Sequence, residues 1–155
     1  LCHACHTLYG IGVVNVRFFS VYGPRGRHDQ VIYKITQMID MGIPVPVVQP
    51  EPMRDFTYVD DIVDGLIRML NLTARCYSVM NLGYGKPEPI NRVIAPIEQA
   101  LGKQSVAGEI VRPLPSDTRA TYANSSRARK LLNWQPAIPL ESGIPLFIEW
   151  YQNKK

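Results

Sequence analysis

The sequence lacks the features that define several classes of protein. It has no run of about 18–20 apolar residues, which a membrane-spanning helix requires, and no stretch of five or more basic residues, which would favour nucleic-acid binding. Its three cysteines in 155 residues are too few for a disulfide scaffold, and no secretory signal pattern opens the chain. We therefore expect a cytoplasmic protein with neither a membrane nor a nucleic-acid partner.

The residues that are present fit one globular domain. Apolar residues make up 46% of the sequence, and the formal net charge is only +4. A chain of this length buries roughly two-thirds of its unfolded surface on folding. Because the arginines are scattered, they suggest contacts with discrete anionic groups on a small ligand.

Hydrophobic spacing predicts alternating strands and helices, and therefore an α/β fold with parallel strand pairing. The strand at residues 13–19 is almost uniformly apolar, which suits burial on both faces. Strands are expected at 13–19, 45–48, 77–82 and 106–111, and helices at 1–9, 29–41, 60–70, 88–101, before Asn133 and around 144–151. The apolar helix faces are Ile62, Leu66, Ile67 and Leu70, and Ile144, Phe147, Ile148 and Tyr151.

Polar residues and glycines predict where several helices begin and end. We expect Asp29 to cap the helix that follows it and Gly42 to end that helix. Asp60 and Asp61 are expected to cap the next helix, at the positive end of its dipole. Ser125 or Ser126 is expected to cap the short helix that ends near Asn133.

Residues 17–27 (RFFSVYGPRGR) join an apolar strand to a loop with glycine, proline and arginine. The strand delivers Ser20 to its carboxyl end, which is the edge where α/β sheets bind ligands. The loop can turn the chain so that Arg27 returns over the same crevice. A hydroxyl and a guanidinium that converge would suit a carboxylate; the alternative is a solvated surface loop.

Four motifs together resemble the extended short-chain dehydrogenase/reductase family, the NAD-dependent nucleotide-sugar epimerases and dehydratases. They are residues 17–27, 54–61 (RDFTYVDD), 115–117 (PSD) and 121–136 (TYANSSRARKLLNWQP). The first motif is most similar to UDP-glucuronate 4-epimerases. The resemblance implies an α/β fold that is the C-terminal part of an NAD-binding Rossmann-like fold, together with its small substrate-binding lobe.

The same resemblance implies a set of binding residues for NAD and a UDP-sugar. In the family, the Ser20 and Arg27 positions bind the sugar carboxylate, and the Arg54 position binds the diphosphate. The implied cofactor contacts are Phe19 and Tyr22, and the implied substrate contacts are Ser20, Arg27, Gln30, Val31, Pro46, Val48, Arg54 and Asp117. No catalytic residue and no metal ligand is expected, because we expect no tyrosine of the chain to form the family's Tyr-x-x-x-Lys pair, and no glycine cluster has the G-x-G-x-x-G spacing.

The resemblance further implies one partial domain, residues 1–155, without the N-terminal dinucleotide-binding half. Residues 12–42 and 74–103 are assigned to the Rossmann sheet and its helices, and residues 43–73 and 104–155 mainly to the substrate lobe. We expect the chain alone to be inactive and to self-associate through an uncovered sheet edge, and the full-length enzyme to be a homodimer. The alternatives are a non-catalytic binding module, or the same half of a 4,6-dehydratase or uronate decarboxylase.

Three positions depart from the family pattern, and one motif competes with it. Ser116 and Asn124 replace a glycine and an aspartate. Leu114 stands where some relatives have a second diphosphate-binding arginine, for which Arg112 is a displaced substitute. Residues 2–6 (CHACH) match the C-x-x-C-H pattern of haem attachment or a metal site. Haem attachment requires export, so we favour a plain internal helix.

Overall fold

The strands pair two by two in the computed structural model, which describes residues 1–72 and 77–154. Three of the pairs are parallel and join segments that are distant in the sequence, as the α/β prediction requires. The parallel pairs are β1 (Val13–Phe18) with β6 (Tyr77–Leu82), β2 (Val21–Tyr22) with β5 (Thr57–Tyr58), and β3 (Val45–Val48) with β8 (Ala107–Val111). The antiparallel pair is β4 (Met53–Asp55) with β7 (Pro87–Pro89).

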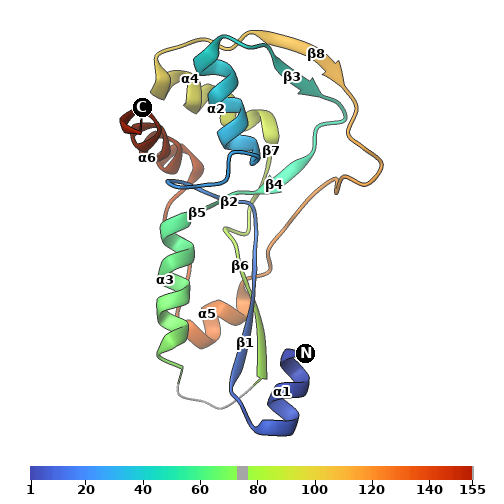
Figure 1. Cartoon of the computed structure of the whole chain (residues 1–155), viewed down its shortest axis with the longest axis vertical. Coiled ribbons are helices and arrows are strands. Elements are labelled where there is room, and N and C mark those ends of the chain that lie inside the picture. The colour runs from blue at the N-terminus through green and yellow to red at the C-terminus, as the bar shows by residue number, and fades with distance from the viewer. Residues whose placement is uncertain (73–76, 155) are drawn as a thin grey trace.

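The helices gather in two groups along an elongated molecule (Figure 1). They are α1 (Cys2–Tyr9), α2 (Val31–Met41), α3 (Val59–Leu70), the 3-10 helix η1 (Ile90–Val93), α4 (Ile94–Leu101), α5 (Ser126–Leu132) and α6 (Leu140–Asn153). In Figure 1, α2, α4 and α6 lie together at the top, while α3 and α5 lie to the left of the β1–β6 pair and α1 lies to its right.

Each group of helices encloses its own hydrophobic core. The upper core packs α2, α4 and α6 around aromatic residues such as Tyr22 and Phe147. The predicted apolar face of the last helix is confirmed, since its four members are between 0% and 5% exposed. The lower core comprises Ile62, Met80, Leu82, Ala128, Leu132 and Trp134. Two separate cores explain why the molecule is long rather than round.

Asp61 joins α3 to the segment after α5 instead of capping its own helix. Helix α3 begins at Val59 and has no side-chain capping bond among the described residues, so the prediction that Asp60 and Asp61 cap it is wrong. The Asp61 carboxylate accepts hydrogen bonds from the N–H groups of Ala137 and Ile138, at 2.9 and 3.1 Å. A buried aspartate thereby supplies acceptors for the backbone of the segment that follows α5.

The start of α2 also differs from the prediction. Gln30 precedes the helix, and no side chain caps it, because Asp29 binds Arg27 instead. The predicted end is confirmed: Gly42 has φ 69°, which a glycine adopts without strain, and its N–H donates to the carbonyl of Ile39.

The predicted start of α5 is confirmed in position but not in mechanism. Ser125 precedes the helix, but its hydroxyl donates to the carbonyl of Gly83 at 3.0 Å. The Asn124 side chain accepts from the N–H of Ser126 at 3.1 Å and so takes the expected role of the serine. The asparagine that departs from the family pattern therefore stabilises the helix start.

The lower part of the molecule, around β1 and α3, exposes several apolar side chains that were expected to be covered. Of the predicted α3 face only Ile62 is buried, and Leu70 is 84% exposed. The prediction that residues 13–19 are covered on both faces is wrong for the described chain, in which Phe18 is 50% exposed. Self-association through this region stays a prediction, and the expected domain boundary at 73/74 falls outside the described residues.

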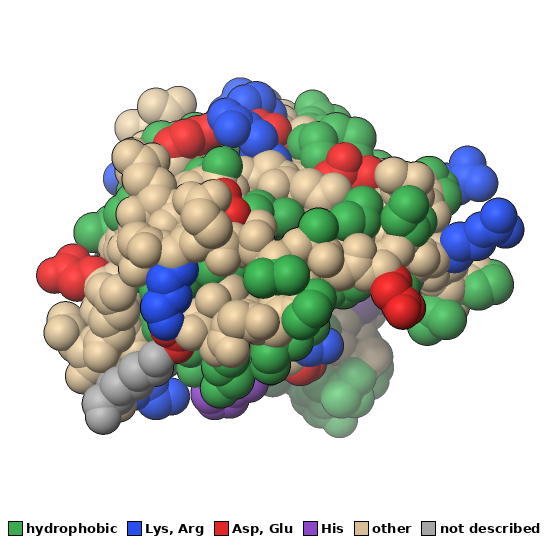
Figure 2. Space-filling model, turned by 90° about the horizontal axis from the view of Figure 1, so that it is seen from above, with side chains coloured by type: hydrophobic (Ala, Val, Ile, Leu, Met, Phe, Trp, Pro, Cys, Tyr) green, Lys and Arg blue, Asp and Glu red, His purple; other side chains and the backbone are tan. Residues whose placement is uncertain are grey.

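The upper surface mixes side chains of every kind. Figure 2 shows positive and negative side chains interspersed with hydrophobic ones over the face formed by the upper group of helices. Among the described residues, no helix has the length and apolar character needed to cross a membrane.

We predict that Gly143→Ala destabilises the fold although it replaces a glycine inside helix α6. A methyl group there would press on the Tyr22 hydroxyl and lie 2.9 Å from Cδ2 of Tyr58. Overpacking of this kind costs about 1–3 kcal/mol, which exceeds the gain of about 1 kcal/mol from better helix propensity. Chemical denaturation would measure the free energy of unfolding, with Ser142→Ala on the exposed side of α6 as the control. A more stable Gly143→Ala variant would contradict this packing.

Candidate substrate-binding site

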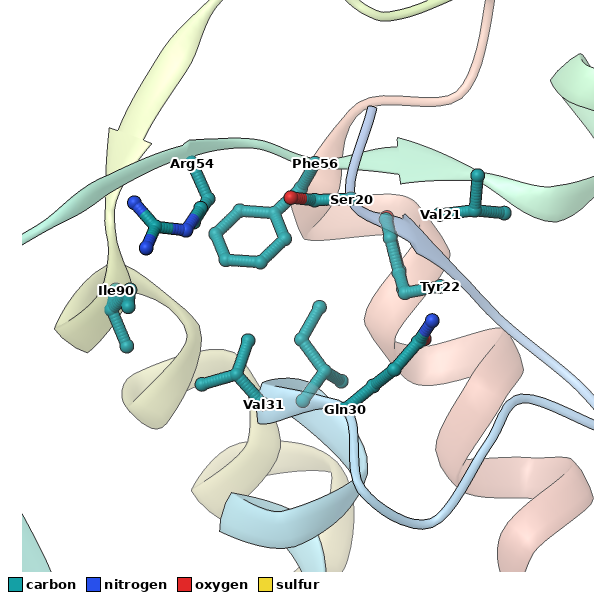
Figure 3. A pocket seen from close by; sticks show the side chains of 9 residues that line it. Ser20, Val21, Tyr22, Gln30, Val31, Arg54, Phe56 and Ile90 are labelled. Carbon is teal, nitrogen blue, oxygen red and sulfur yellow. The ribbon is translucent and has the colours of Figure 1, made fainter. Parts of the chain in front are cut away.

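A cavity of about 310 Å³ lies where β2, β4, η1 and the start of α2 meet (Figure 3). Its walls come from segments that are distant in the sequence and meet only in the fold. They are Ser20, Val21, Tyr22, Gln30, Val31, Ile32, Arg54, Phe56 and Ile90. Four of these, Ser20, Gln30, Val31 and Arg54, are predicted substrate contacts. The lining thus combines an apolar base with a hydroxyl, an amide and one guanidinium.

Ser20 connects β1 to β2 in an unusual backbone conformation. Its φ of 28° is positive, which is uncommon for a residue other than glycine and costs free energy. Its carbonyl accepts a hydrogen bond from the N–H of Thr57 at 3.3 Å, which ties the bend to β5. In Figure 3 the Ser20 hydroxyl lies beside the Phe56 ring at the edge of the cavity.

Arg54 brings the positive charge of the cavity and is held by backbone. Its Nη1 donates to the carbonyl oxygens of Met53, at 2.8 Å, and Thr118, at 2.7 Å. In Figure 3 the guanidinium lies between Ile90 and Phe56 and borders the open space. Because the lining contains no carboxylate, this charge is not neutralised within the cavity.

Helix α2 points its N-terminus at the same cavity through Gln30 and Val31. The first N–H groups of a helix have no partner inside the helix, and the helix dipole makes this end positive. No acidic residue lies in the first turn of α2. Together with Arg54, the helix end provides two independent sources of positive potential for an anion.

Arg27 does not reach this cavity. Its guanidinium forms a salt bridge with the carboxylate of Asp29 at 2.6 Å, and the two side chains are 75% and 61% exposed. The hydrogen bond from Arg27 holds the pKa of Asp29 below its ordinary value. The structure therefore does not bring Ser20 and Arg27 together as the sequence predicts.

The remaining predicted contacts do not line this cavity. Pro46 and Val48 are half-buried on β3, and Phe19 is half-buried just after β1. Asp117 lines a second cavity, of about 390 Å³, together with Arg112 and residues 50–52. Their predicted roles stay predictions.

Tyr22, a predicted cofactor contact, is a core residue on one side and a cavity wall on the other. Its ring packs edge-on against those of Phe56 and Tyr58. Its hydroxyl is the one buried side-chain polar atom that has no hydrogen-bond partner in the described part of the chain. Burial raises the pKa of Tyr22 far above its ordinary value, so the phenol is neutral at physiological pH.

One tyrosine does have the catalytic Tyr-x-x-x-Lys spacing, at the opposite end of the chain. Tyr151 is followed four residues later by Lys155, which lies outside the described residues. Tyr151 is 5% exposed in the upper core, and its hydroxyl donates to Asp40 at 3.1 Å. Burial, reinforced by the bond to Asp40, raises the pKa of Tyr151 to about 12. A general base requires the opposite shift, and the burial of Tyr151 in the upper core indicates a structural role.

The cysteine and histidine motif at the N-terminus has no metal-site geometry. In the described chain no group of three or more cysteine, histidine or acidic side chains is arranged to hold a metal ion. His3 and His6 instead contact the ring of Tyr77, with centroid separations of 4.9 and 6.0 Å. These contacts attach α1 to the end of β6.

Asp55 is the important residue of the site that the sequence analysis did not single out. It is fully buried, and its carboxylate accepts hydrogen bonds from the N–H of Gly85, at 3.0 Å, and of Ala123, at 2.8 Å. Its own N–H donates to Thr121 Oγ1 at 3.1 Å. Burial raises the pKa of Asp55, and the two N–H donors oppose that rise.

Comparison with protein families matches residues 1–83 to the model of the NAD dependent epimerase/dehydratase family. The chain is also 38% identical to a UDP-glucuronate 4-epimerase from Thermodesulfobacterium geofontis over 152 residues, which is 97% of this chain and 46% of that protein. It is 31% identical to UDP-glucuronate 4-epimerase 5 of Arabidopsis thaliana, covering 97% of this chain and 38% of the relative. The chain therefore spans half or less of the length of these curated relatives.

Solved structures give the same result. The UDP-glucuronic acid 4-epimerase of Bacillus cereus, in complex with UDP-glucuronic acid and NAD, superposes with a TM-score of 0.90 at 27% identity, covering 99% of this chain and 49% of that one. The UDP-glucose 4-epimerase of Thermotoga maritima, with UDP-glucose, superposes with a TM-score of 0.86 at 25% identity, covering 98% of this chain and 50% of that one. The fold is thus that of part of an epimerase of this type.

We predict that Asp55→Asn lowers the free energy of unfolding by about 2–3 kcal/mol, because an amide turns one of the acceptors into a donor that faces backbone N–H groups. Asp60→Asn makes the same change at an exposed position and should cost less than about 0.5 kcal/mol. Urea denaturation followed by circular dichroism would measure both. Equal stability of the two variants would show that the Asp55 bonds do not hold the site.

Proposed function

The chain belongs to the NAD dependent epimerase/dehydratase family, and we propose that it is the C-terminal, substrate-binding part of a UDP-glucuronate 4-epimerase. The observation that carries the proposal is the cavity in which Ser20, Gln30, Val31 and Arg54 meet. It offers cationic and hydrogen-bonding groups without a competing carboxylate, as a nucleotide diphosphate requires.

In this proposal Arg54 and the start of α2 bind the diphosphate. The guanidinium donates to phosphate oxygens, and the first amides of α2 donate from the neighbouring wall. Pro46 and Val48 on β3 contact the uracil. With the nucleotide fixed, the sugar extends toward Ser20, at the carboxyl end of β1.

Arg27 reaches the sugar carboxylate by exchanging its partner. Its pair with Asp29 is exposed, and solvent screening makes exposed ion pairs weak. A substrate carboxylate close to Ser20 therefore competes with Asp29 at little cost. The Ser20 hydroxyl donates to the same carboxylate, so that selectivity for a uronic acid comes from two residues of one loop.

The residues of this chain could contact one part of a bound NAD, but they do not form a complete NAD site. Phe19 lies at the carboxyl end of β1, where α/β sheets bind cofactors, but no G-x-G-x-x-G loop occurs in the sequence. NAD, when bound, supplies the hydride acceptor for oxidation at C4 of the sugar. The described residues would orient the sugar against it, which is catalysis by positioning.

The alternative is a binding module without catalytic activity. The binding groups of the cavity would serve it equally, and Tyr151, the one tyrosine with the catalytic spacing, is buried in the upper core and bonded to Asp40. The alternatives of a 4,6-dehydratase or a uronate decarboxylase use the same binding groups. We further propose that the complete enzyme is a cytoplasmic homodimer.

We predict that Arg54→Ala weakens UDP binding by more than about tenfold, because a charge-assisted contact contributes about 1.5–3 kcal/mol. Isothermal titration calorimetry of the chain with UDP would measure the affinity. Arg129→Ala, at an exposed position on α5, changes the net charge equally and should leave the affinity within about twofold. If Arg54→Ala binds UDP with unchanged affinity, the proposal that the diphosphate binds in this cavity is contradicted.

We predict that Arg27→Ala and Ser20→Ala each reduce the preference for UDP-glucuronate over UDP-glucose. The loss should be about five- to tenfold for Arg27→Ala, since one charge-assisted bond disappears. Competition against a fluorescent UDP analogue would measure both affinities, and UDP itself serves as the control ligand because it lacks the sugar. A preference that both variants retain in full would contradict a uronic acid substrate bound by this loop.

A further inference from the structure

We propose that Lys86 is a positioning residue for the diphosphate site, because it holds the carboxylate of Glu88 away from the guanidinium of Arg54. Its effect on ligand affinity passes through Glu88, whose charge would otherwise neutralise the cation of the cavity. The inference rests on the proposed function, since an unpaired Arg54 matters only if the ligand is an anion.

Glu88 lies directly opposite Arg54 in the antiparallel pair of β7 with β4. Residues opposite each other project from the same face of such a pair, with their Cβ atoms about 4.5–5.5 Å apart. This face borders the cavity, because Arg54 lines it and so does Ile90, two residues after Glu88 (Figure 3). Glu88 is therefore a carboxylate within side-chain reach of the cavity's cation.

The backbone on either side of Glu88 is stiff. Pro87 and Pro89 flank it within β7, and each proline ring fixes its own φ near about −65°. The Glu88 side chain is also mostly buried, with 17% of it exposed. The carboxylate therefore has little freedom to withdraw into solvent, and its side-chain conformation decides which cation it meets.

Lys86 is the cation that Glu88 meets. Its Nζ lies 2.6 Å from Glu88 Oε1, and residues two positions apart along an extended segment share a face. The hydrogen bond to Glu88 raises the pKa of Lys86, so the ammonium group stays charged. Glu141, another acid whose charge acts on Lys86, is itself paired with Arg92 at 2.8 Å. Lys86 is thus available to hold Glu88.

Arg54 meets neutral groups as a result. Its Nη1 donates to the carbonyl oxygens of Met53 and Thr118, at 2.8 and 2.7 Å, and none of the salt bridges within residues 1–72 and 77–154 includes it. Without Lys86, the Glu88 carboxylate would be attracted across the strand pair to Arg54. An arriving diphosphate would then have to displace it.

Calorimetric titration with UDP tests this role in single and double variants. Lys86→Ala should weaken UDP binding about fivefold, whereas Glu88→Gln and the double variant Lys86→Ala/Glu88→Gln should stay within about twofold of the unchanged chain. The lysine is not needed once the carboxylate is gone. Lys130→Ala, exposed on α5, makes the same change in net charge as Lys86→Ala and should also stay within about twofold.

The failure of this inference is distinguishable from the failure of the proposed function. If Lys86→Ala binds UDP as Lys130→Ala does, or if the double variant stays as weak as Lys86→Ala, the positioning role is wrong and the proposed site stands. If Arg54→Ala has no effect on UDP binding, both proposals fall.

A second measurement needs no ligand. The NMR signal of the Arg54 Nε–H should shift in Lys86→Ala, when Glu88 turns to the guanidinium, and should return to its original position in the double variant. A signal that does not move in Lys86→Ala would also overturn the inference.

Discussion

The buried carboxylate of Asp55 is the interaction on which the candidate site depends. Its two N–H partners, from Gly85 and Ala123, belong to segments 30 and 68 positions later in the chain. Because side chains alternate along a strand, turning Asp55 inward places its neighbours, Arg54 and Phe56, on the opposite side. Both of those neighbours line the cavity. One buried acid thereby determines where the site's cation points.

Asp61 applies the same principle in the lower half of the molecule. It binds the N–H groups of Ala137 and Ile138, and its carbonyl accepts the indole N–H of Trp134 at 2.9 Å. Two acids six positions apart thus attach the C-terminal third of the chain to β4 and α3. An acid is a better choice here than a neutral acceptor, since bonds to a charged group are stronger. Asp55 and Asp61 are therefore architectural, while Arg54 faces the candidate site.

Secondary structure was predicted correctly from the sequence where a hydrophobic repeat extended over enough residues to be recognised. β1 and β6 have six residues each and follow the predicted bounds closely, and α6 buries the four residues predicted for its apolar face. β2, β4, β5 and β7 have two or three residues each, too few for an alternation pattern, and only their partners define them. The helix expected at 88–101 failed at its start for this reason, because residues 87–89 are strand β7 and the next turn is the 3-10 helix η1.

The residues of the candidate site also divide into those that sequence motifs predict and those whose role depends on tertiary contacts. Ser20, Gln30, Val31 and Arg54 were predicted from motifs, and the fold does bring them together. The sequence could not show that Arg27 pairs with Asp29. An aspartate at this position can either cap the helix that follows it or form an ion pair with the arginine two residues before it. The sequence also could not show the role of Asp55, whose partners are backbone groups that carry no side-chain signal.

Arg54, which lines the cavity, and Arg27, which lies outside it, differ in a way that has consequences for the proposed binding. Arg54 is oriented by two main-chain carbonyls, so little conformational entropy remains to be lost when an anion arrives. Arg27 is exposed and paired with a side chain, so it must release Asp29 before it binds anything else. An anchored cation suits the part that all UDP-sugars share, and an exchangeable cation suits the part in which they differ. Under the proposed function, affinity for the nucleotide and selectivity for the sugar acid therefore come from separate residues.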